Sequence, residues 1–173
     1  MLAIVTVLGL AVIAASAIGL LGIRSLDAQT NTLDNFAQRA YFAEKVNGLI
    51  TAVNASNRGI TSARNADESS DYLKEAQQNG AALLDAIEQW RPLVPDDAMP
   101  AFERVASDAK SYVQLRLELA DYGAKEGAAA GMAKLKEPQY RLNRQALQKS
   151  LTDNTNAIRA TLEPLRADKD AAN

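Results

Sequence analysis

The sequence predicts an all-α protein: an antiparallel up-down four-helix bundle whose first helix is continuous with an N-terminal transmembrane helix. Three observations support this prediction. Residues 2–23 are apolar and carry no charge. From residue 24 onward, apolar residues recur mostly at steps of three, four or seven, which is the spacing of one helix face. The first proline is Pro92, so nothing in the sequence forces a helix to end where the apolar segment ends.

Residues 1–23 form the predicted transmembrane helix. Between residues 2 and 23 the only hydroxyl side chains are Thr6 and Ser16, and a helix of this length would measure about 33 Å, enough to cross a bilayer. The alternative is a cleaved signal peptide, because Ala-Ser-Ala at 15–17 has the small-x-small form of a cleavage site. The apolar run continues past that site and no basic region precedes it, which favours a span in contact with membrane lipid.

The domain that follows, residues 24–166, begins with helices predicted at 24–66 and 69–91. The inner face of the first is Leu26, Leu33, Phe36, Ala40, Ala43, Val46, Ile50, Val53, Ile60 and Ala63. We expect Asp67 or Ser69 to cap the second helix. Its inner face alternates steps of three and four, as in a left-handed bundle, through Leu73, Ala76, Gly80, Leu83, Ile87 and Trp90.

The other two helices are predicted at 97–122 and 126–166, with Asp96 and Asp97 expected to cap the former. Their inner faces are Ala98, Phe102, Val105, Ala109, Tyr112, Arg116 and Leu119, then Met132, Leu135, Leu142, Leu147, Leu151, Asn154, Ile158 and Leu162. Pro138 either kinks the fourth helix or marks where a short preceding helix gives way to the main one. Short connections make neighbours antiparallel, so the fourth helix returns toward the membrane. We expect the polar residues 167–173 to lead to a second span that this sequence lacks.

The composition excludes most familiar catalytic and metal chemistries. The 173 residues include no cysteine and no histidine, which excludes disulfides, thiolate or histidine metal sites and the usual catalytic triads. The 19 lysines and arginines nearly balance the 21 aspartates and glutamates, so no general attraction to nucleic acid is implied. We therefore expect no enzyme activity, no metal, no cofactor and no nucleic-acid partner.

Polar residues on the predicted inner faces are the candidate ligand-binding residues, because a buried charge without a partner is costly. Arg116 and Asn57 each occupy a position where the pattern requires an apolar side chain, and Arg144 lies on or beside the inner face of the fourth helix. With their neighbours, the candidates are Asn54, Asn57, Arg58, Arg64, Arg116 and Arg144.

Two interpretations of these residues stay open at this point. Arginines and amides from different helices can converge on a pocket for a small anionic ligand, for which guanidinium groups are well matched. Alternatively, each arginine extends to water or pairs with an internal carboxylate such as Glu118 or Asp121. Arg58 lies near the far end of the first helix, whereas we expect the end of the third helix, with Arg116, to lie closer to the membrane. This difference in height counts against a single site.

Several segments resemble the N-terminal part of a bacterial methyl-accepting chemotaxis protein. They are Asn57-Arg58-Gly59-Ile60, Trp90 followed by Leu93-Val94-Pro95-Asp96-Asp97, and Arg141-Leu-Asn143-Arg144-Gln-Ala-Leu147, set in a span and a bundle with long outer helices. The resemblance covers nearly the whole chain. It implies a ligand-sensing bundle in the periplasm, anchored in the bacterial inner membrane and dimerised through the first helix. It also implies that a small ligand, such as an amino acid or organic acid, shifts the fourth helix and so signals across the membrane.

Two alternatives to a chemoreceptor follow from the same pattern. The bundle can serve a sensor histidine kinase or another signalling enzyme, a reading that differs only in the sequence downstream. From another class, a membrane-anchored helical scaffold predicts no pocket, with apolar or fully paired residues at every inner position.

Overall fold

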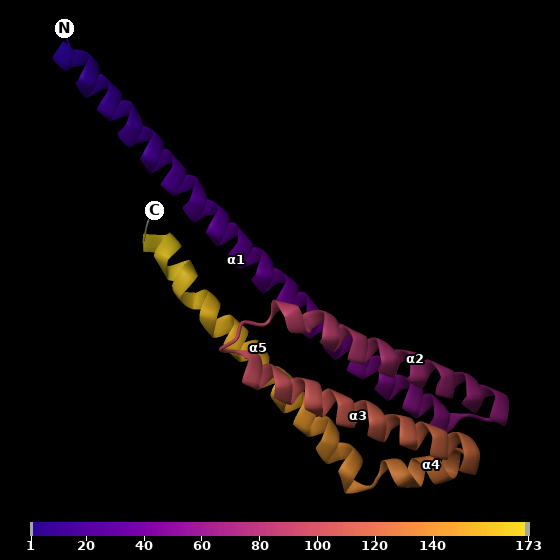
Figure 1. Ribbon diagram of the computed structural model, residues 1–173. Coiled ribbons are helices and arrows are strands. Elements are labelled where there is room, and N and C mark those ends of the chain that lie inside the picture. The colour runs from indigo at the N-terminus through magenta and orange to yellow at the C-terminus, as the bar shows by residue number, and fades with distance from the viewer. Residues whose placement is uncertain (1, 172–173) are drawn as a thin grey trace. The chain divides into compact units, whose positions relative to one another are not determined.

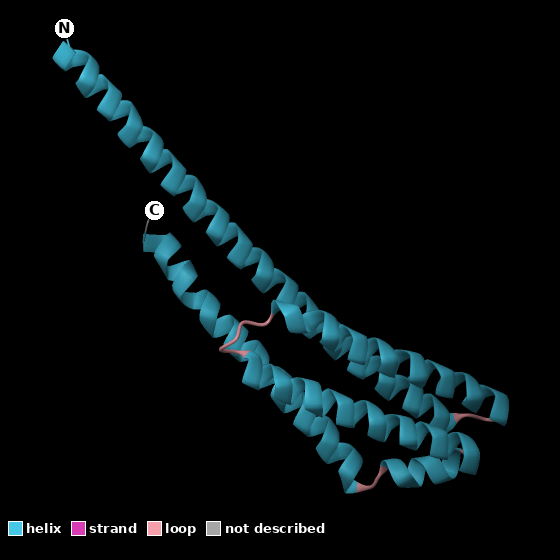
Figure 2. Cartoon of the chain, viewed as in Figure 1, coloured by secondary structure: helices cyan, strands magenta, loops and turns pink. Residues whose placement is uncertain are grey.

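The computed structural model is all-helical, with five α-helices packed together (Figure 1). It describes the backbone of residues 2–171 and the side chains of residues 32–160, and no strand occurs in that part of the chain. Loops are confined to short connections (Figure 2). The elements are α1 (Leu2–Ser62), α2 (Ala66–Trp90), the 3₁₀-helix η1 (Arg91–Leu93), α3 (Met99–Glu126), α4 (Ala128–Leu135) and α5 (Pro138–Ala171).

The chain divides into two compact units, Met1–Gln38 and Arg39–Asn173. The described part of the first unit is the stretch of helix α1 up to Gln38, and the rest of α1 belongs to the second unit. The predicted span at 2–23 lies outside the residues whose side chains are described and stays a prediction. Among the helices of the described residues, none combines the length and apolarity that a membrane crossing requires.

Within the second unit, cross-helix contacts give the helix directions. From α2 to α1, Asn79 donates a hydrogen bond to Ser56 at 3.2 Å, whereas Gln89, farther along α2, accepts one from the earlier residue Lys45 at 3.4 Å. These two helices are therefore antiparallel.

Helix α3 is antiparallel to α5 and runs in the same direction as α1. Arg116 of α3 donates to the Tyr140 carbonyl at 3.2 Å, and the earlier Ser111 accepts from the later Asn143 at 3.0 Å. Toward α1, the Tyr112 hydroxyl donates to the Ile50 carbonyl at 3.2 Å, and farther along both helices Gly123 lies against Ile60.

The core confirms most of the predicted inner faces. Its buried members include Val46, Ile50, Val53 and Ile60 of α1, Ala76, Leu83, Ile87 and Trp90 of α2, Phe102, Val105, Ala109, Tyr112 and Leu119 of α3, and Leu147, Leu151 and Ile158 of α5. Burial of these apolar faces supplies the main drive for helix packing. Leu26 and Leu162 lie outside the residues with described side chains.

Four residues assigned to inner faces are instead exposed: Leu33, Ala40, Met132 and Leu142. Leu33 belongs to the first unit, where the described side chains build no core. On α5 the buried face begins with Tyr140, seven residues before Leu147, so Leu142 points elsewhere and is 56% exposed.

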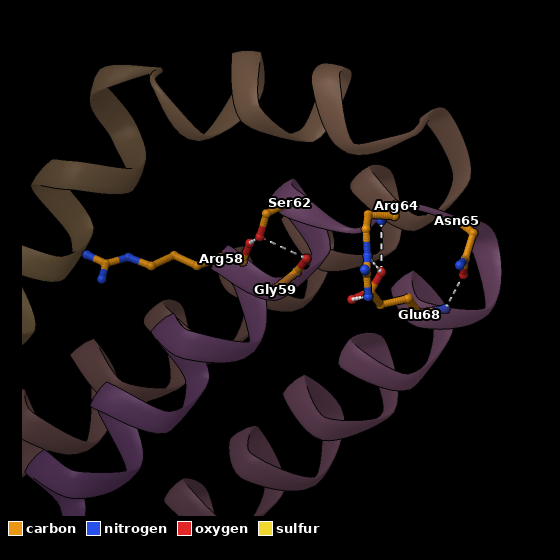
Figure 3. A network of polar contacts seen from close by, with 6 residues as sticks. All are labelled: Arg58, Gly59, Ser62, Arg64, Asn65 and Glu68. Carbon is orange, nitrogen blue, oxygen red and sulfur yellow. Dashed lines mark hydrogen bonds and ion pairs between the residues drawn. The ribbon is translucent and has the colours of Figure 1, made fainter.

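The predicted caps of the second and third helices are wrong. Helix α2 begins earlier than expected, and its N-cap is Asn65, whose Oδ1 accepts from the Glu68 backbone N–H at 2.8 Å, in place of Asp67 or Ser69 (Figure 3). Glu68 in turn accepts from the Arg64 backbone N–H at 2.9 Å. The first bond satisfies a free N–H group in the first turn of α2, and the second holds the residue that precedes the cap. At the start of α3 the N-cap is Ala98, with no side-chain capping bond from Asp96 or Asp97.

The predicted fourth helix is two helices. Helix α3 continues to Glu126 and ends at Gly127, whose φ of 92° suits glycine. The short helix α4 then precedes α5, which starts at Pro138, so the second reading of that proline is confirmed. A Cβ on Gly131 of α4 would lie 3.0 Å from the Gly123 Cα, so the α3 and α4 backbones are in direct contact. This close approach brings the α4–α5 connection against the bundle.

Candidate functional site

A pocket of about 330 Å³ lies in the second unit, between α1, α3 and the α4–α5 connection. We call it the anion pocket, for the charges described below. Its lining residues are Asn54, Asn57, Arg58, Arg116, Leu135, Lys136, Tyr140, Arg141 and Arg144. The structure thus brings together five of the six predicted candidates and leaves out Arg64. Its size is at the low end of small-molecule sites, which suits a compact ligand.

Arg116 forms the buried side of the anion pocket and is 3% exposed. Its guanidinium centre lies 5.3 Å from the Tyr112 ring centroid and 5.8 Å from that of Tyr140, and its Nη2 donates to the Tyr140 carbonyl. These contacts hold the planar group between two aromatic side chains. Burial lowers the pKa of Arg116, and the neighbouring Tyr112 opposes that shift.

Neither carboxylate proposed as a partner for Arg116 takes that role. Glu118 accepts a hydrogen bond from Gln114 at 3.1 Å, and Asp121 pairs with Lys125 at 2.7 Å. Within the described residues the buried Nε of Arg116 has no hydrogen-bond partner. The charge of Arg116 is therefore held by carbonyl and aromatic contacts, and no carboxylate in the described part of the chain neutralises it.

The two tyrosines beside Arg116 cannot serve as counter-charges near neutral pH. Burial raises the pKa of Tyr112 to about 12, although the charges of Arg116 and Arg144 act in the opposite direction. Burial also raises the pKa of Tyr140. Both phenols stay neutral, so their rings attract the guanidinium only through their π faces.

The charges that line the anion pocket are all positive: Arg58, Arg116, Lys136, Arg141 and Arg144. None of these five forms an ion pair with a carboxylate of the described residues, whose ion pairs all join other side chains. The nearby Glu137 is not part of the lining and accepts a hydrogen bond from Gln139 at 2.9 Å. Such an arrangement can attract and hold an anion.

Polar groups at the base of the anion pocket are incompletely satisfied. Asn57 is 1% exposed, and its Nδ2 donates to the Val53 carbonyl at 3.0 Å while its Oδ1 has no partner. The buried Nε of Arg144, like that of Arg116, also has none among the described residues. Buried polar atoms without partners are uncommon, and a bound ligand or water is the usual explanation.

Arg58 and Arg64 are close in sequence and differ in environment. The Arg64 side chain is 86% exposed, and its Nε pairs with Glu68 at 3.3 Å, which raises the pKa of Arg64 and lowers that of Glu68. The Arg58 side chain extends away from this turn (Figure 3) and lines the anion pocket. The structure therefore places Arg64 in the α1–α2 turn, outside the site.

The expectation that Arg58 and Arg116 lie at different heights is wrong. The third helix of an antiparallel series runs in the same direction as the first, and the α1–α3 contacts described above follow that direction. The far part of α1 and the later part of α3 therefore lie side by side.

Sequence reasoning missed four lining residues: Leu135, Lys136, Tyr140 and Arg141. The inward position of Tyr140 could have been predicted, since it precedes the buried Leu147 by two helical turns on the same helix face. The position of Lys136 could not, because only the break between α4 and α5 brings it to the site.

Comparison of the chain with models of protein families, with curated proteins and with solved structures finds no match. The resemblance to chemotaxis receptors thus rests on the sequence segments quoted above, and function has to be inferred from the anion pocket.

Proposed function

We propose that the protein is the ligand-sensing, extracytoplasmic part of a transmembrane chemoreceptor, and that a small anion is its ligand. The observation that carries this proposal is the lining of the anion pocket, with five cations and no carboxylate. Helices α1, α3 and α5 all contribute to that lining, so an anion bound there would contact three separate helices at once.

The electrostatics favour binding. Arg116 is buried and Arg144 is half-buried, and the two charges oppose one another, since Arg144 contributes to the lowered pKa of Arg116. Mutual repulsion between cations in a partly dehydrated site is unfavourable, and an anion placed among them removes it. Ligand binding is therefore expected to stabilise the fold.

The architecture in this proposal is an up-down four-helix bundle, with α4 as a short helix before α5. The first part of helix α1, residues 2–23, spans the membrane, the bundle lies in the periplasm of a bacterial cell, and two copies dimerise through α1. An anion held by Arg58 on α1 and by Arg141 and Arg144 on α5 favours one packing of α5 over another. Only such a difference in affinity between two packings can transmit a signal.

The anion pocket argues against the scaffold but does not distinguish a chemoreceptor from another signalling protein. A membrane-anchored scaffold predicts no pocket and fully paired inner residues. The pocket supports the sensor instead, as does Arg116, whose Nε has no hydrogen-bond partner among the described residues. A sensor histidine kinase or another signalling enzyme shares the same sensing bundle, and the downstream sequence of the gene distinguishes these from a chemoreceptor.

Thermal denaturation tests the ligand proposal. The full 173-residue chain, purified in a non-ionic detergent, is heated with amino acids, organic acids or inorganic phosphate while helical circular dichroism is followed. A ligand at a hundred times its Kd adds about 2.7 kcal/mol to the unfolding free energy and raises Tm. Arg58→Gln should lose this response, and Arg64→Gln, with its charge in the neighbouring turn, should keep it. No stabilising anion, or equal responses of the two variants, overturns the proposal.

Membrane attachment is tested separately. The full chain expressed in bacterial cells should stay in the membrane fraction after an alkaline carbonate wash, and deletion of residues 2–23 should release it. Release of the undeleted chain by the wash contradicts the predicted span.

A further inference from the structure

We infer that the ligand of the anion pocket is a compact anion with at least two negative charges and no ammonium group. This inference rests on the proposed function, because it specifies the ligand of the same pocket.

The number and placement of the cations favour a multiply charged ligand. They come from four places: Arg58 on α1, Arg116 on α3, Lys136 in the α4–α5 connection, and Arg141 with Arg144 on α5. A single carboxylate has about four acceptor sites on two oxygens at one end of a ligand, so it cannot reach cations on every side of the pocket. A ligand with anionic groups at both ends can engage α1 and α5 together.

The degree of burial divides the five cations into two groups. Arg116 is 3% exposed and Arg144 is half-buried, so water screens their charges less than those of the other three cations. Arg58, Lys136 and Arg141 are exposed and form the outer group. A ligand with one anionic group near Arg144 and another among the outer three neutralises charge in both groups.

An ammonium group has no place in this lining. Amino acids require acceptors for their ammonium, usually carboxylates or several carbonyl oxygens, and the lining contains no carboxylate. The only side-chain amides there belong to Asn54 and Asn57, and the open Asn57 Oδ1 offers one acceptor to a group that carries three donors. Five neighbouring cations repel an ammonium, so the pocket selects against the zwitterions that a general anion site would accept.

Guanidinium groups bind carboxylates and phosphoryl groups through the same paired N–H donors. The chemistry fixed by the lining is therefore the charge of the ligand and the absence of an amine. The source of the charge, carboxylate or phosphoryl, is left to separate arms of the test.

Isothermal titration calorimetry on the full chain tests the inference at constant pH and ionic strength. Succinate, aspartate and butyrate share a four-carbon skeleton and differ in charge and in the amino group. Succinate should bind at least about tenfold more tightly than either of the others, the difference expected from one charge-assisted hydrogen bond. Raising the salt concentration should weaken succinate more than butyrate. Inorganic phosphate forms the fourth arm, and tighter binding than succinate assigns the charge to a phosphoryl group.

Two variants on α5 complete the design. Arg141→Gln removes a lining cation and should weaken succinate, while Arg159→Gln removes an exposed cation of the same helix outside the pocket and should not. Both should keep the helical circular dichroism of the parent. If aspartate binds as tightly as succinate and Arg141→Gln weakens both, the ligand class is wrong and the anion-sensing function stands. If no anion binds, the proposed function fails with it.

Discussion

Among the described residues, Arg91 and Arg116 both lie over aromatic rings, and their surroundings differ. The guanidinium of Arg91 lies 5.5 Å from the Phe102 ring centroid and pairs with both Glu88 and Glu103. The guanidinium of Arg116 lies 5.3 Å from the Tyr112 centroid and pairs with no carboxylate of the described residues. The charge of Arg91 is neutralised by two carboxylates of the protein, and these ion pairs link the end of α2 to the start of α3. The charge of Arg116 remains available to pair with an anionic ligand.

This contrast separates a structural arginine from a binding one without reference to relatives. Both groups satisfy the preference of guanidinium for an aromatic face. What differs is the supply of carboxylates, two around Arg91 and none in the lining of the anion pocket. The predictions below test that difference in order of expected effect.

Replacing Arg116 with methionine should have the largest effect. We expect Arg116→Met to weaken succinate binding by about tenfold or more, because the buried charge is lost. Its Tm should be unchanged or higher, since an apolar side chain of similar length replaces an unpaired buried charge. Arg91→Met should do the reverse and lower Tm without changing affinity. Calorimetric titration measures affinity, and thermal denaturation measures Tm. A lower Tm for Arg116→Met with no drop for Arg91→Met would show that Arg116, and not Arg91, has the structural role.

Gly131→Ala should disturb the pocket through the backbone. The added Cβ would lie 3.0 Å from the Gly123 Cα, and a backbone atom cannot turn aside as a side chain does. We expect a loss of about 1–3 kcal/mol in unfolding free energy. Succinate should also bind more weakly, because Leu135 and Lys136 follow α4.

Gly48→Ala is the control for that substitution. Beyond the adjoining backbone of α1 and the two neighbouring residues, no described atom lies within 4 Å of a Cβ at Gly48, so alanine should stabilise the helix by about 0.5–1 kcal/mol. Urea titration measures both variants. Equal effects of the two substitutions would show that the α3–α4 contact is not tight.

Tyr112 should make stability depend on pH in the alkaline range. Its pKa is raised from 10.0 to about 12 by burial, so folding favours the neutral phenol. This stabilisation is complete below pH 10 and is lost as the pH rises toward 12. The loss should be on the order of 2 kcal/mol. Tyr112→Phe should lack that part of the decline when urea titrations are repeated across the range, and parallel declines would contradict the burial of the hydroxyl.

Asn65→Ala should have the smallest effect. It removes the side-chain cap of α2 and should cost about 1 kcal/mol of unfolding free energy. Succinate affinity should not change, because Asn65 and its neighbour Arg64 belong to the turn and do not line the pocket. A change in affinity, measured by titration calorimetry, would extend the site into that turn.

Much of the fold and part of the site could be predicted from the sequence. The spacing of apolar residues located the cores of all four main helices, because burial depends on helical periodicity. The same pattern identified Asn57 and Arg116 as polar residues at apolar positions. The structure buries both residues, and both line the anion pocket.

The remainder depends on local geometry that periodicity does not report. Asn65, Asp67 and Ser69 are all good capping residues. Asn65 takes the role by accepting from the Glu68 backbone N–H, while the Glu68 side chain holds the preceding residue through the Arg64 backbone N–H. Arg64 resembles Arg58 in sequence context, and only its pairing with Glu68 separates the two. Lys136 lines the pocket because the helix is interrupted between α4 and α5, just before Pro138. The sequence left open whether Pro138 kinks one helix or starts a second.

The most direct test of the central claim is side-chain NMR of the full chain labelled with ¹⁵N-arginine, titrated with succinate. The account predicts that the guanidinium signals of Arg58, Arg116 and Arg144 shift together and reach saturation. It predicts that those of Arg64 and Arg91, whose charges are already paired, stay in place. Shifts that are absent, or that spread equally over all five arginines without saturation, would contradict an anion site at Arg116.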